Sequence, residues 1–151
     1  MSKKVLILSS SFRKGGNSDT LCDQFAMGAR DAGHAVEKIF LNDKHIGYCR
    51  GCGVCNTTHK CIQKDDMAEI LNKMVEADVI VMGTPVYFYS MNGQMKTLID
   101  RTVPRYEEIS GKEFYFIVAA ADSSHANMEK TLEAFLSLIH ISEPTRRVVI
   151  S

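Results

Sequence analysis

Four short apolar runs divide the chain, and each is followed by a polar loop and a segment with apolar residues at helical spacing. Runs that are apolar on both faces are typical of strands buried in a parallel sheet, which needs helices over both faces. The predicted strands are Val5–Leu8, Ala35–Leu41, Ala77–Gly83 and Glu113–Ala120. The predicted helices are Ser18–Ala32, Asp65–Val75, Ser90–Thr102 and Asn127–Phe135.

This alternation of strand and helix predicts an α/β fold with three layers, in which a doubly wound parallel sheet of the flavodoxin-like type forms the centre. Crossovers between neighbouring parallel strands are right-handed, and the pattern favours the strand order 2-1-3-4. Ligands of such sheets bind where the strands end, at the switch between the first and third strands. The loops after these two strands are therefore expected to form one binding edge.

The loop after the first strand, SSSFRKGGNS, concentrates hydrogen-bond donors at the start of a helix. Serine hydroxyls, the Arg13 guanidinium and the Asn17 amide surround two glycines, which let backbone N–H groups turn inward. Such convergence on a helix N-terminus predicts a phosphate site. The spacing fits neither G-x-G-x-x-G nor G-x-x-x-x-G-K-[ST], which disfavours a classical dinucleotide fold and a P-loop NTPase. An ordinary loop capped by Asn17 or Ser18 is the alternative.

Composition narrows the class of protein. The chain has 151 residues, of which 45% are hydrophobic and 24% charged, as in a soluble globular domain. The formal net charge of zero and the lack of basic runs argue against nucleic-acid and membrane partners. The sequence shows no signal peptide and no apolar stretch of bilayer length, so a cytoplasmic location is expected.

Four of the five cysteines lie within the segment 42–64, which is too long and too cysteine-rich to be a simple connector. In the cytoplasm this crowding indicates metal or redox chemistry rather than disulfides. The spacing C-x2-C-x2-C-x5-C suits a [4Fe-4S] cluster, whereas structural zinc more often uses two separate knuckles. Zinc and free thiols stay open as alternatives. The candidate metal ligands are Cys49, Cys52, Cys55 and Cys61, while Cys22 is expected to be inert core.

Three segments resemble the signatures of one family. SSSFRKGGNS resembles the S-x-R-x-x-G-N-[ST] phosphate loop of the NAD(P)H-dependent FMN reductase-like group of flavodoxin-fold proteins. GTPVYFYSMNGQMKTLIDR resembles the second signature of that group, after its third strand. CRGCGVCNTTHKC, followed by IQKDDM, resembles the cysteine loop of its iron–sulfur flavoprotein branch. Together these similarities cover nearly all of the chain up to Phe135.

The resemblance implies which residues contact FMN. The phosphate is expected to bind residues of the first loop: Ser9, Ser11, Arg13, Asn17 and Ser18. The isoalloxazine ring is expected to lie near residues that follow the third strand: Pro85, Val86, Tyr87, Phe88, Asn92 and Gly93. Aromatic and apolar walls suit a flat ring. Since three successive aromatics at 87–89 cannot all point inward, at least one is expected to face a ligand or a subunit partner, although packing of this loop on its own helix is an alternative.

Two positions depart from the family pattern. Phe12 stands where a proline is common, and Ala120–Asp122 stands where relatives often have glycines near the flavin. The third loop at the binding edge, Ala121–His125, is therefore assigned no flavin contact.

The implied activity is that of an FMN-containing NAD(P)H oxidoreductase, which passes hydride to the flavin and electrons on to a quinone, a flavin or another small acceptor. No side chain is nominated as catalytic. One alternative is an electron carrier with FMN and a [4Fe-4S] cluster, acting with a ferredoxin-like partner. The other is a non-enzymatic zinc-binding module. By resemblance, a homodimer is expected.

The last residues are interpreted separately. Leu136–Arg146, LSLIHISEPTR, resembles the translation of a sequencing adapter, so residues 136–151 are expected to be a non-native tail on a domain of residues 1–135. The flavodoxin-like sheet is then expected to be truncated before its fifth strand, which leaves an edge of the fourth strand exposed.

Overall fold

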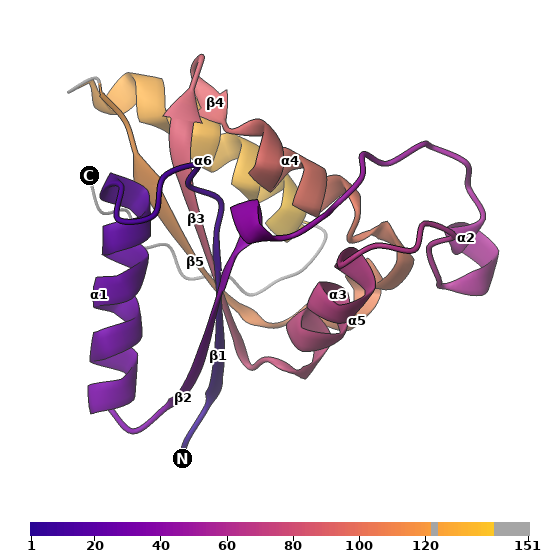
Figure 1. Cartoon of the computed structure of the whole chain (residues 1–151), viewed down its shortest axis with the longest axis horizontal. Coiled ribbons are helices and arrows are strands. Elements are labelled where there is room, and N and C mark those ends of the chain that lie inside the picture. Colours follow the sequence, from indigo (N-terminus) through magenta and orange to yellow (C-terminus); the bar gives the residue numbers. More distant parts are fainter. Residues whose placement is uncertain (122–123, 141–151) are drawn as a thin grey trace.

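A computed structural model describes residues 1–121 and 124–140 (Figure 1). Its centre is a parallel sheet with the order β2-β1-β3-β5, which confirms the predicted order 2-1-3-4. A short strand, β4, pairs antiparallel with the end of β3. The strands are β1 (Lys4–Ser9), β2 (Ala35–Phe40), β3 (Val79–Tyr87), β4 (Ser90–Met91) and β5 (Glu113–Ala119).

Helices cover both faces of the sheet and complete the three predicted layers. In Figure 1, α1 lies on one face, and α3, α4 and α6 lie on the other. Four short helical turns, η1, α2, η2 and α5, lie in the connections. The helices are α1 (Asn17–Asp31), η1 (Leu41–Asp43), α2 (Cys55–Thr58), α3 (Met67–Glu76), α4 (Gly93–Asp100), η2 (Val103–Arg105), α5 (Tyr106–Ile109) and α6 (His125–His140).

Alternate residues of β1 show why its apolar run is continuous. Val5 and Ile7 pack with residues of α1, whereas Leu6 and Leu8 pack in a larger cluster with residues of α3, α4 and α6. Successive side chains of a strand point to opposite faces, so a strand covered on both sides needs apolar residues at every position. The same rule explains the apolar runs of β3 and β5.

Several predicted boundaries were wrong for local reasons. The third strand continues to Tyr87, because the chain folds back and pairs Ser90–Met91 with its end. The helix predicted at 90–102 therefore begins only at Gly93, where the side chain of Asn92 accepts a hydrogen bond from the Met95 N–H at 3.1 Å. The long 42–64 segment also contains one helical turn, α2.

Only part of the C-terminal predictions falls on residues that the structure describes. Helix α6 begins at His125 and continues to His140, past the predicted end at Phe135. Residues 122–123, within the third loop, and 141–151, most of the predicted tail, lie outside the described residues. The non-native tail thus stays a prediction. Within the described ranges, β5 pairs with β3 and with no strand on its other edge.

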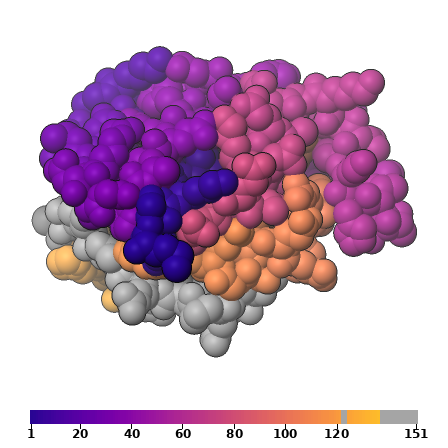
Figure 2. Space-filling model, turned by 90° about the horizontal axis from the view of Figure 1, so that it is seen from below, coloured from indigo at the N-terminus to yellow at the C-terminus, as the bar shows by residue number. Residues whose placement is uncertain are grey.

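The cysteine-rich segment stands out from the body. Figures 1 and 2 both show the chain around α2 projecting to one side, next to the residues that precede β5. In residues 1–121 and 124–140, no helix has both the length and the apolar character needed to cross a membrane.

We predict that Gly83→Ala destabilises the fold. A Cβ at Gly83 would lie 2.3 Å from the Cys22 Sγ atom, so β3 and α1 would have to move apart. Overpacking of this kind lowers the free energy of unfolding by about 1–3 kcal/mol. Adding Cys22→Ala should restore most of the loss, as measured by urea unfolding followed by circular dichroism.

Gly28→Ala in α1 is the matched control, because no atom lies within 4 Å of a Cβ at that position. Alanine there is expected to stabilise the helix by about 0.5–1 kcal/mol. If Gly83→Ala leaves the unfolding midpoint unchanged, the close approach of α1 to β3 does not require a glycine at position 83.

Candidate functional site

The loops after β1 and β3 meet at one edge of the sheet, as predicted. The hydroxyl and the N–H of Ser10 both donate to the Gly83 carbonyl, at 3.0 and 2.9 Å. The Asn92 side chain donates to the Ser10 carbonyl at 2.5 Å and is 1% exposed. Its oxygen accepts the N–H at the start of α4. The Asn92 side chain thus joins the two loops and also caps α4.

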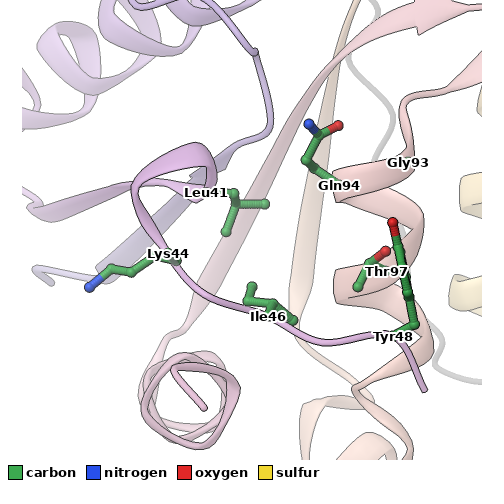
Figure 3. A pocket seen from close by; sticks show the side chains of 7 residues that line it. All are labelled: Leu41, Lys44, Ile46, Tyr48, Gly93, Gln94 and Thr97. Carbon is green, nitrogen blue, oxygen red and sulfur yellow. The ribbon is translucent and has the colours of Figure 1, made fainter. Parts of the chain in front are cut away.

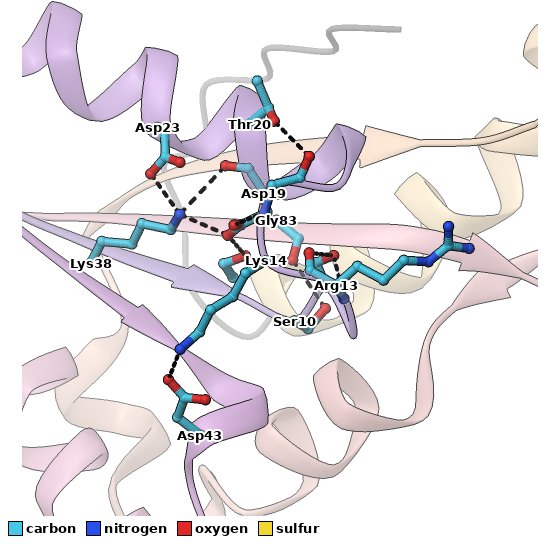
Figure 4. A network of polar contacts seen from close by, with 12 residues as sticks. Ser10, Arg13, Lys14, Asp19, Thr20, Asp23, Lys38, Asp43 and Gly83 are labelled. Atoms are coloured by element: carbon cyan, nitrogen blue, oxygen red, sulfur yellow. Dashed lines mark hydrogen bonds and ion pairs between the residues drawn. The ribbon is translucent and has the colours of Figure 1, made fainter.

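A buried carboxylate, Asp19, shapes the loop after β1 (Figure 4). It accepts hydrogen bonds from the Ser9 hydroxyl at 2.7 Å and from the Gly15 N–H at 2.9 Å. Lys38 of β2 pairs with it at 2.7 Å. Burial opposes the charge of Asp19, but these hydrogen bonds and Lys38 lower its pKa below the ordinary 3.8. Sequence reasoning missed Asp19, since its charged partner Lys38 lies on a different strand, β2.

The start of α1 is open for an anion. Its N-cap is Gly16, which provides no side chain, and neither Asn17 nor Ser18 caps the helix. The alternative in which Asn17 or Ser18 caps the helix is therefore not what the structure shows. The first amides of a helix have no partner within the helix, so they point toward whatever lies beyond its end.

Arg13 stands beside this opening with its charge available. Its side chain is exposed and extends away from the Asp19 network in Figure 4, and it forms no ion pair among the described residues. By contrast, Lys14 is paired with Asp43 at 2.6 Å and lies over the Phe40 ring. The Ser11 hydroxyl donates to the Arg13 carbonyl at 2.8 Å.

The predicted flavin-ring loop is a strained hairpin. Phe88 and Tyr89 occupy the turn between β3 and β4 with φ values of +48° and +65°. Positive φ at both central positions is the pattern of a type I′ turn, which favours Asn and Gly. Phe88 is 96% exposed, and Tyr87 and Tyr89 are about half exposed. None of the three aromatic side chains is buried, and the expectation that at least one of them faces a ligand or a subunit partner stays a prediction.

A small pocket of about 220 Å³ lies against the start of α4 (Figure 3). Apolar side chains of the segment after β2 face polar side chains of the helix across it. The residues that line it are Leu41, Lys44, Ile46, Tyr48, Gly93, Gln94 and Thr97. Gly93, a residue predicted to lie near the flavin, thus lines this pocket. Residues of segment 41–48 form the other wall of the pocket, and sequence reasoning did not identify them.

The cysteine loop does not gather its thiols in this structure. Cys49 and Cys52 are exposed, Cys55 and Cys61 are half-buried, and all four are free. In the part of the chain that the structure describes, no three Cys, His, Asp or Glu side chains are grouped closely enough to hold a metal ion. The thiolate donor set suits a metal chemically, but its spacing alone does not bring the ligands together.

Cys22 differs from these four. It is fully buried between α1 and the sheet, and burial raises the pKa of its thiol to about 12. A neutral buried thiol behaves as a small apolar side chain, which agrees with the prediction of inert core.

A buried ion pair joins the base of the cysteine loop to α4. Arg101 binds Asp65 through both terminal nitrogens, at 2.7 and 3.0 Å. Asp65 also accepts a hydrogen bond from the Met67 N–H, at the start of α3, at 3.2 Å. Sequence reasoning did not single out Arg101, because its partner lies far away in the sequence.

The parallel sheet, with helices on both faces and two loops that meet at one sheet edge, defines a flavodoxin-like α/β protein. The chain belongs to the NADPH-dependent FMN reductase family, whose family model matches residues 3–151. The resemblance found in the sequence motifs, to an FMN reductase family, is therefore confirmed.

Individual proteins agree with this assignment. An iron-sulfur flavoprotein of Archaeoglobus fulgidus is 40% identical over 102 residues, which are 68% of this chain and 46% of that protein. A putative NAD(P)H-dependent FMN-containing oxidoreductase of Bacillus subtilis, YwqN, is 25% identical over 146 residues, covering 91% of this chain and 77% of that protein. The chain spans about half the length of the first curated relatives it matches, 46% and 52%.

A solved structure shows the same fold. The azoreductase from Bacillus anthracis superposes with a TM-score of 0.77 over 99% of this chain and 86% of that one. The two sequences are 19% identical.

We predict that Asp19→Asn destabilises the protein in a pH-dependent way. Because the native pKa of Asp19 is lowered, its contribution is full above the unfolded value of about 3.9 and is lost as the pH falls through the native pKa. Near pH 7 the loss in free energy of unfolding should be about 1–3 kcal/mol. Urea unfolding near pH 7 and about pH 3 measures both ends of this range.

Asp23→Asn serves as the control, since Asp23 pairs with the same Lys38 but its side chain is 54% exposed. An exposed pair contributes only about 0–1 kcal/mol. Equal effects of the two variants at both pH values would contradict a special role for Asp19.

We also predict that the double change Phe88→Asn and Tyr89→Gly stabilises the protein. It replaces two residues that are strained at positive φ by residues suited to that conformation, for a gain of about 1–2 kcal/mol. Changing both residues to alanine removes the rings but keeps the strain, so this control should give no gain. Thermal unfolding distinguishes the two variants.

Proposed function

We propose that this chain binds FMN and acts as an NAD(P)H-dependent oxidoreductase. Membership of the NADPH-dependent FMN reductase family supports the activity. The observation that carries the proposal is the start of α1, which has no side-chain cap and lies beside Arg13, a residue without an ion pair in the part of the chain that the structure describes. When bound, FMN takes a hydride from NAD(P)H and passes its electrons to a quinone, a flavin or another small acceptor.

Some residues of the phosphate loop contact the phosphate, and others fix the conformation of the loop. Arg13 and Asn17 are exposed and reach the phosphate with charged and amide donors, next to the free amides of α1. Ser11 and Ser18 are buried in the wall of the loop, at 5% and 2% exposure. Ser9 supports the loop from below through its bond to Asp19.

Gly16 fits the same role. A Cβ at this position would lie 3.2 Å from the Ser11 hydroxyl and 3.2 Å from the Arg13 carbonyl. The loop is thus folded tightly around a residue without a side chain, which keeps the first amides of α1 accessible to the phosphate.

The second loop supplies the walls for the flavin ring. Pro85 and Val86 are half-buried at the end of β3, and Tyr87 and Phe88 extend from it as exposed aromatic side chains. Such walls exclude water from a flat apolar ring. Asn92 positions this loop against the phosphate loop, and Gly93 opens the helix without a side chain in the way.

A second candidate function is that of an iron–sulfur flavoprotein, in which electrons also pass between FMN and a [4Fe-4S] cluster. It is favoured by the cysteine loop and by the relatives named iron-sulfur flavoprotein, one of them 42% identical over 101 residues. Cys49, Cys52, Cys55 and Cys61 would hold the cluster, and a ferredoxin-like protein would be the electron partner.

The proposed assembly is a homodimer located in the cytoplasm. The exposed aromatic side chains at the tip of the hairpin support self-association, since apolar rings of this size are commonly covered at interfaces. Small molecules are the proposed acceptors of the reductase.

The absorption spectrum of the purified protein separates these functions. Flavin bands that NADPH bleaches support the reductase, whereas bands bleached only by dithionite, with iron and sulfide present, support the electron carrier. A colourless protein that contains zinc contradicts both and favours the metal-binding module.

We predict that Arg13→Ala weakens FMN binding by about ten- to a hundredfold, because it removes a charge-assisted contact to the phosphate. Flavin fluorescence titration of the apoprotein measures the dissociation constant. Arg30→Ala, at the opposite end of α1, also removes an exposed arginine and should leave the affinity unchanged. Unchanged flavin content in the Arg13 variant contradicts the phosphate assignment.

A further inference from the structure

The pocket against the start of α4 has one wall that hydrogen bonds hold in place. This wall is the chain between η1 and the first cysteine of the cysteine loop. His45 and Asp66 exchange two hydrogen bonds, one between their main chains at 3.0 Å and one from the His45 N–H to the Asp66 carboxylate at 2.6 Å. Gly47 donates to the Asp65 carboxylate at 2.9 Å and accepts from Nη1 of Arg101 at 2.7 Å. The pocket is therefore preformed, as small-molecule sites usually are.

The polar side chains that line this pocket have no hydrogen-bond partners among the described residues. Thr97 of α4 is only 8% exposed, and a buried hydroxyl normally has a partner. The side-chain amide of Gln94 lies one turn earlier on the same helix. The Tyr48 ring lies alongside Thr97 in Figure 3, with its hydroxyl directed toward the start of α4. Three unpaired hydrogen-bonding groups thus line one cavity.

No charged group among the described lining residues points into the pocket. Lys44 is the one charged residue among them, and its ammonium group points away from α4 in Figure 3. The side chains of Leu41 and Ile46 add apolar surface. The phosphates of a dinucleotide need cationic groups or free helix amides, and the start of α4 is already capped by Asn92. The pocket therefore suits a neutral ligand.

The size of the pocket limits this ligand to one ring. An apolar cavity of about 150 Å³ holds benzene, so the volume of about 220 Å³ accommodates one ring with its substituents. Hydroxyl and amide groups donate hydrogen bonds to carbonyl oxygens, and apolar side chains pack on the face of a ring. A single-ring quinone has these features, because it is flat and neutral and carries carbonyl oxygens at its edge.

The pocket also lies beside the loop that is proposed to hold the flavin ring. Gly93 lines the pocket, and the preceding residue, Asn92, donates to the Ser10 carbonyl of the phosphate loop. A ligand in the pocket is thus close to the place proposed for the redox cofactor.

We infer that this pocket binds a single-ring quinone, the electron acceptor of the proposed reductase. Tyr48, Gln94 and Thr97 donate hydrogen bonds to its carbonyl oxygens, and Leu41 and Ile46 contact its ring. The inference rests on the proposed function, in which the quinone gains two electrons and two protons and becomes a hydroquinone. The two electrons and one proton leave NAD(P)H as hydride, and the second proton comes from water.

The experiment measures the binding of duroquinone to the full chain without FMN. Every free ring position of this benzoquinone carries a methyl group, so it does not add readily to the exposed thiols of the cysteine loop. Saturation-transfer NMR detects bound duroquinone through its methyl signals, and equilibrium dialysis gives the Kd. Tyr48→Phe and Gln94→Leu should each weaken binding by about three- to tenfold, because each removes one hydrogen-bond donor.

Tyr106→Phe and Gln24→Leu are the matched controls, since they remove the same groups from residues outside this pocket and should leave the Kd unchanged. Tyr48 is 80% exposed, so its variant is expected to fold like the wild type. Thr97→Val keeps the shape of the side chain, and it should weaken binding to a similar extent.

Competition measurements distinguish the other possible occupants. If FMN displaces duroquinone, the pocket is part of the flavin site, and if nicotinamide displaces it, the pocket belongs to the reductant. Either result overturns the inference. It is also overturned if the wild type does not bind duroquinone, or if Tyr48→Phe and Gln94→Leu bind it as tightly as the wild type does.

The proposed reductase has its own readout, the bleaching of the flavin bands by NADPH. If NADPH leaves the flavin oxidised but duroquinone binds through Tyr48 and Gln94, the reductase is refuted and the quinone pocket stands. In the active protein with FMN, Tyr48→Phe should raise the KM for duroquinone and leave the KM for NADPH unchanged.

Discussion

The candidate site depends on how one buried carboxylate is neutralised. Asp19 lies in the first turn of α1, where its negative charge would repel the anion that we propose binds at the helix end. This charge is neutralised by the ion pair with Lys38 and by hydrogen bonds from Ser9 and Gly15. Asp19 can then fix the conformation of the loop without weakening the positive electrostatic potential at the N-terminus of α1. The bonds also link β1, β2 and α1, so the geometry of the anion site is set by the core of the sheet.

The architecture was predictable from local pattern because strands buried on both faces must be apolar throughout. The order of the strands, and the meeting of two loops at one edge, follow from this pattern and from the handedness of crossovers. The loop sequence also carries a family signature, so Arg13 and Asn17 were identifiable as phosphate contacts to propose. None of these inferences needed a long-range side-chain contact.

What escaped prediction depends on contacts between distant residues or on backbone strain. Asp19 and Arg101 have ordinary sequence surroundings, and only folding brings Lys38 and Asp65 to them. The turn at Phe88–Tyr89 contradicts local preference, because aromatic residues disfavour positive φ. The spacing of the four cysteines defines a possible ligand set, but the path of the backbone decides whether the thiols meet.

The two ends of the cysteine loop, segments 45–48 and 63–66, are held together, and this affects how the loop can evolve. Bringing the ends of a flexible segment together has an entropic cost that increases only with the logarithm of its length. Here hydrogen bonds between His45 and Asp66, together with the bond from Arg101 to the Gly47 carbonyl, hold the two ends of the cysteine loop in place. Insertions and deletions between these ends therefore leave the sheet and the anion site undisturbed. The segment can therefore vary in length and sequence while the parallel sheet keeps its structure.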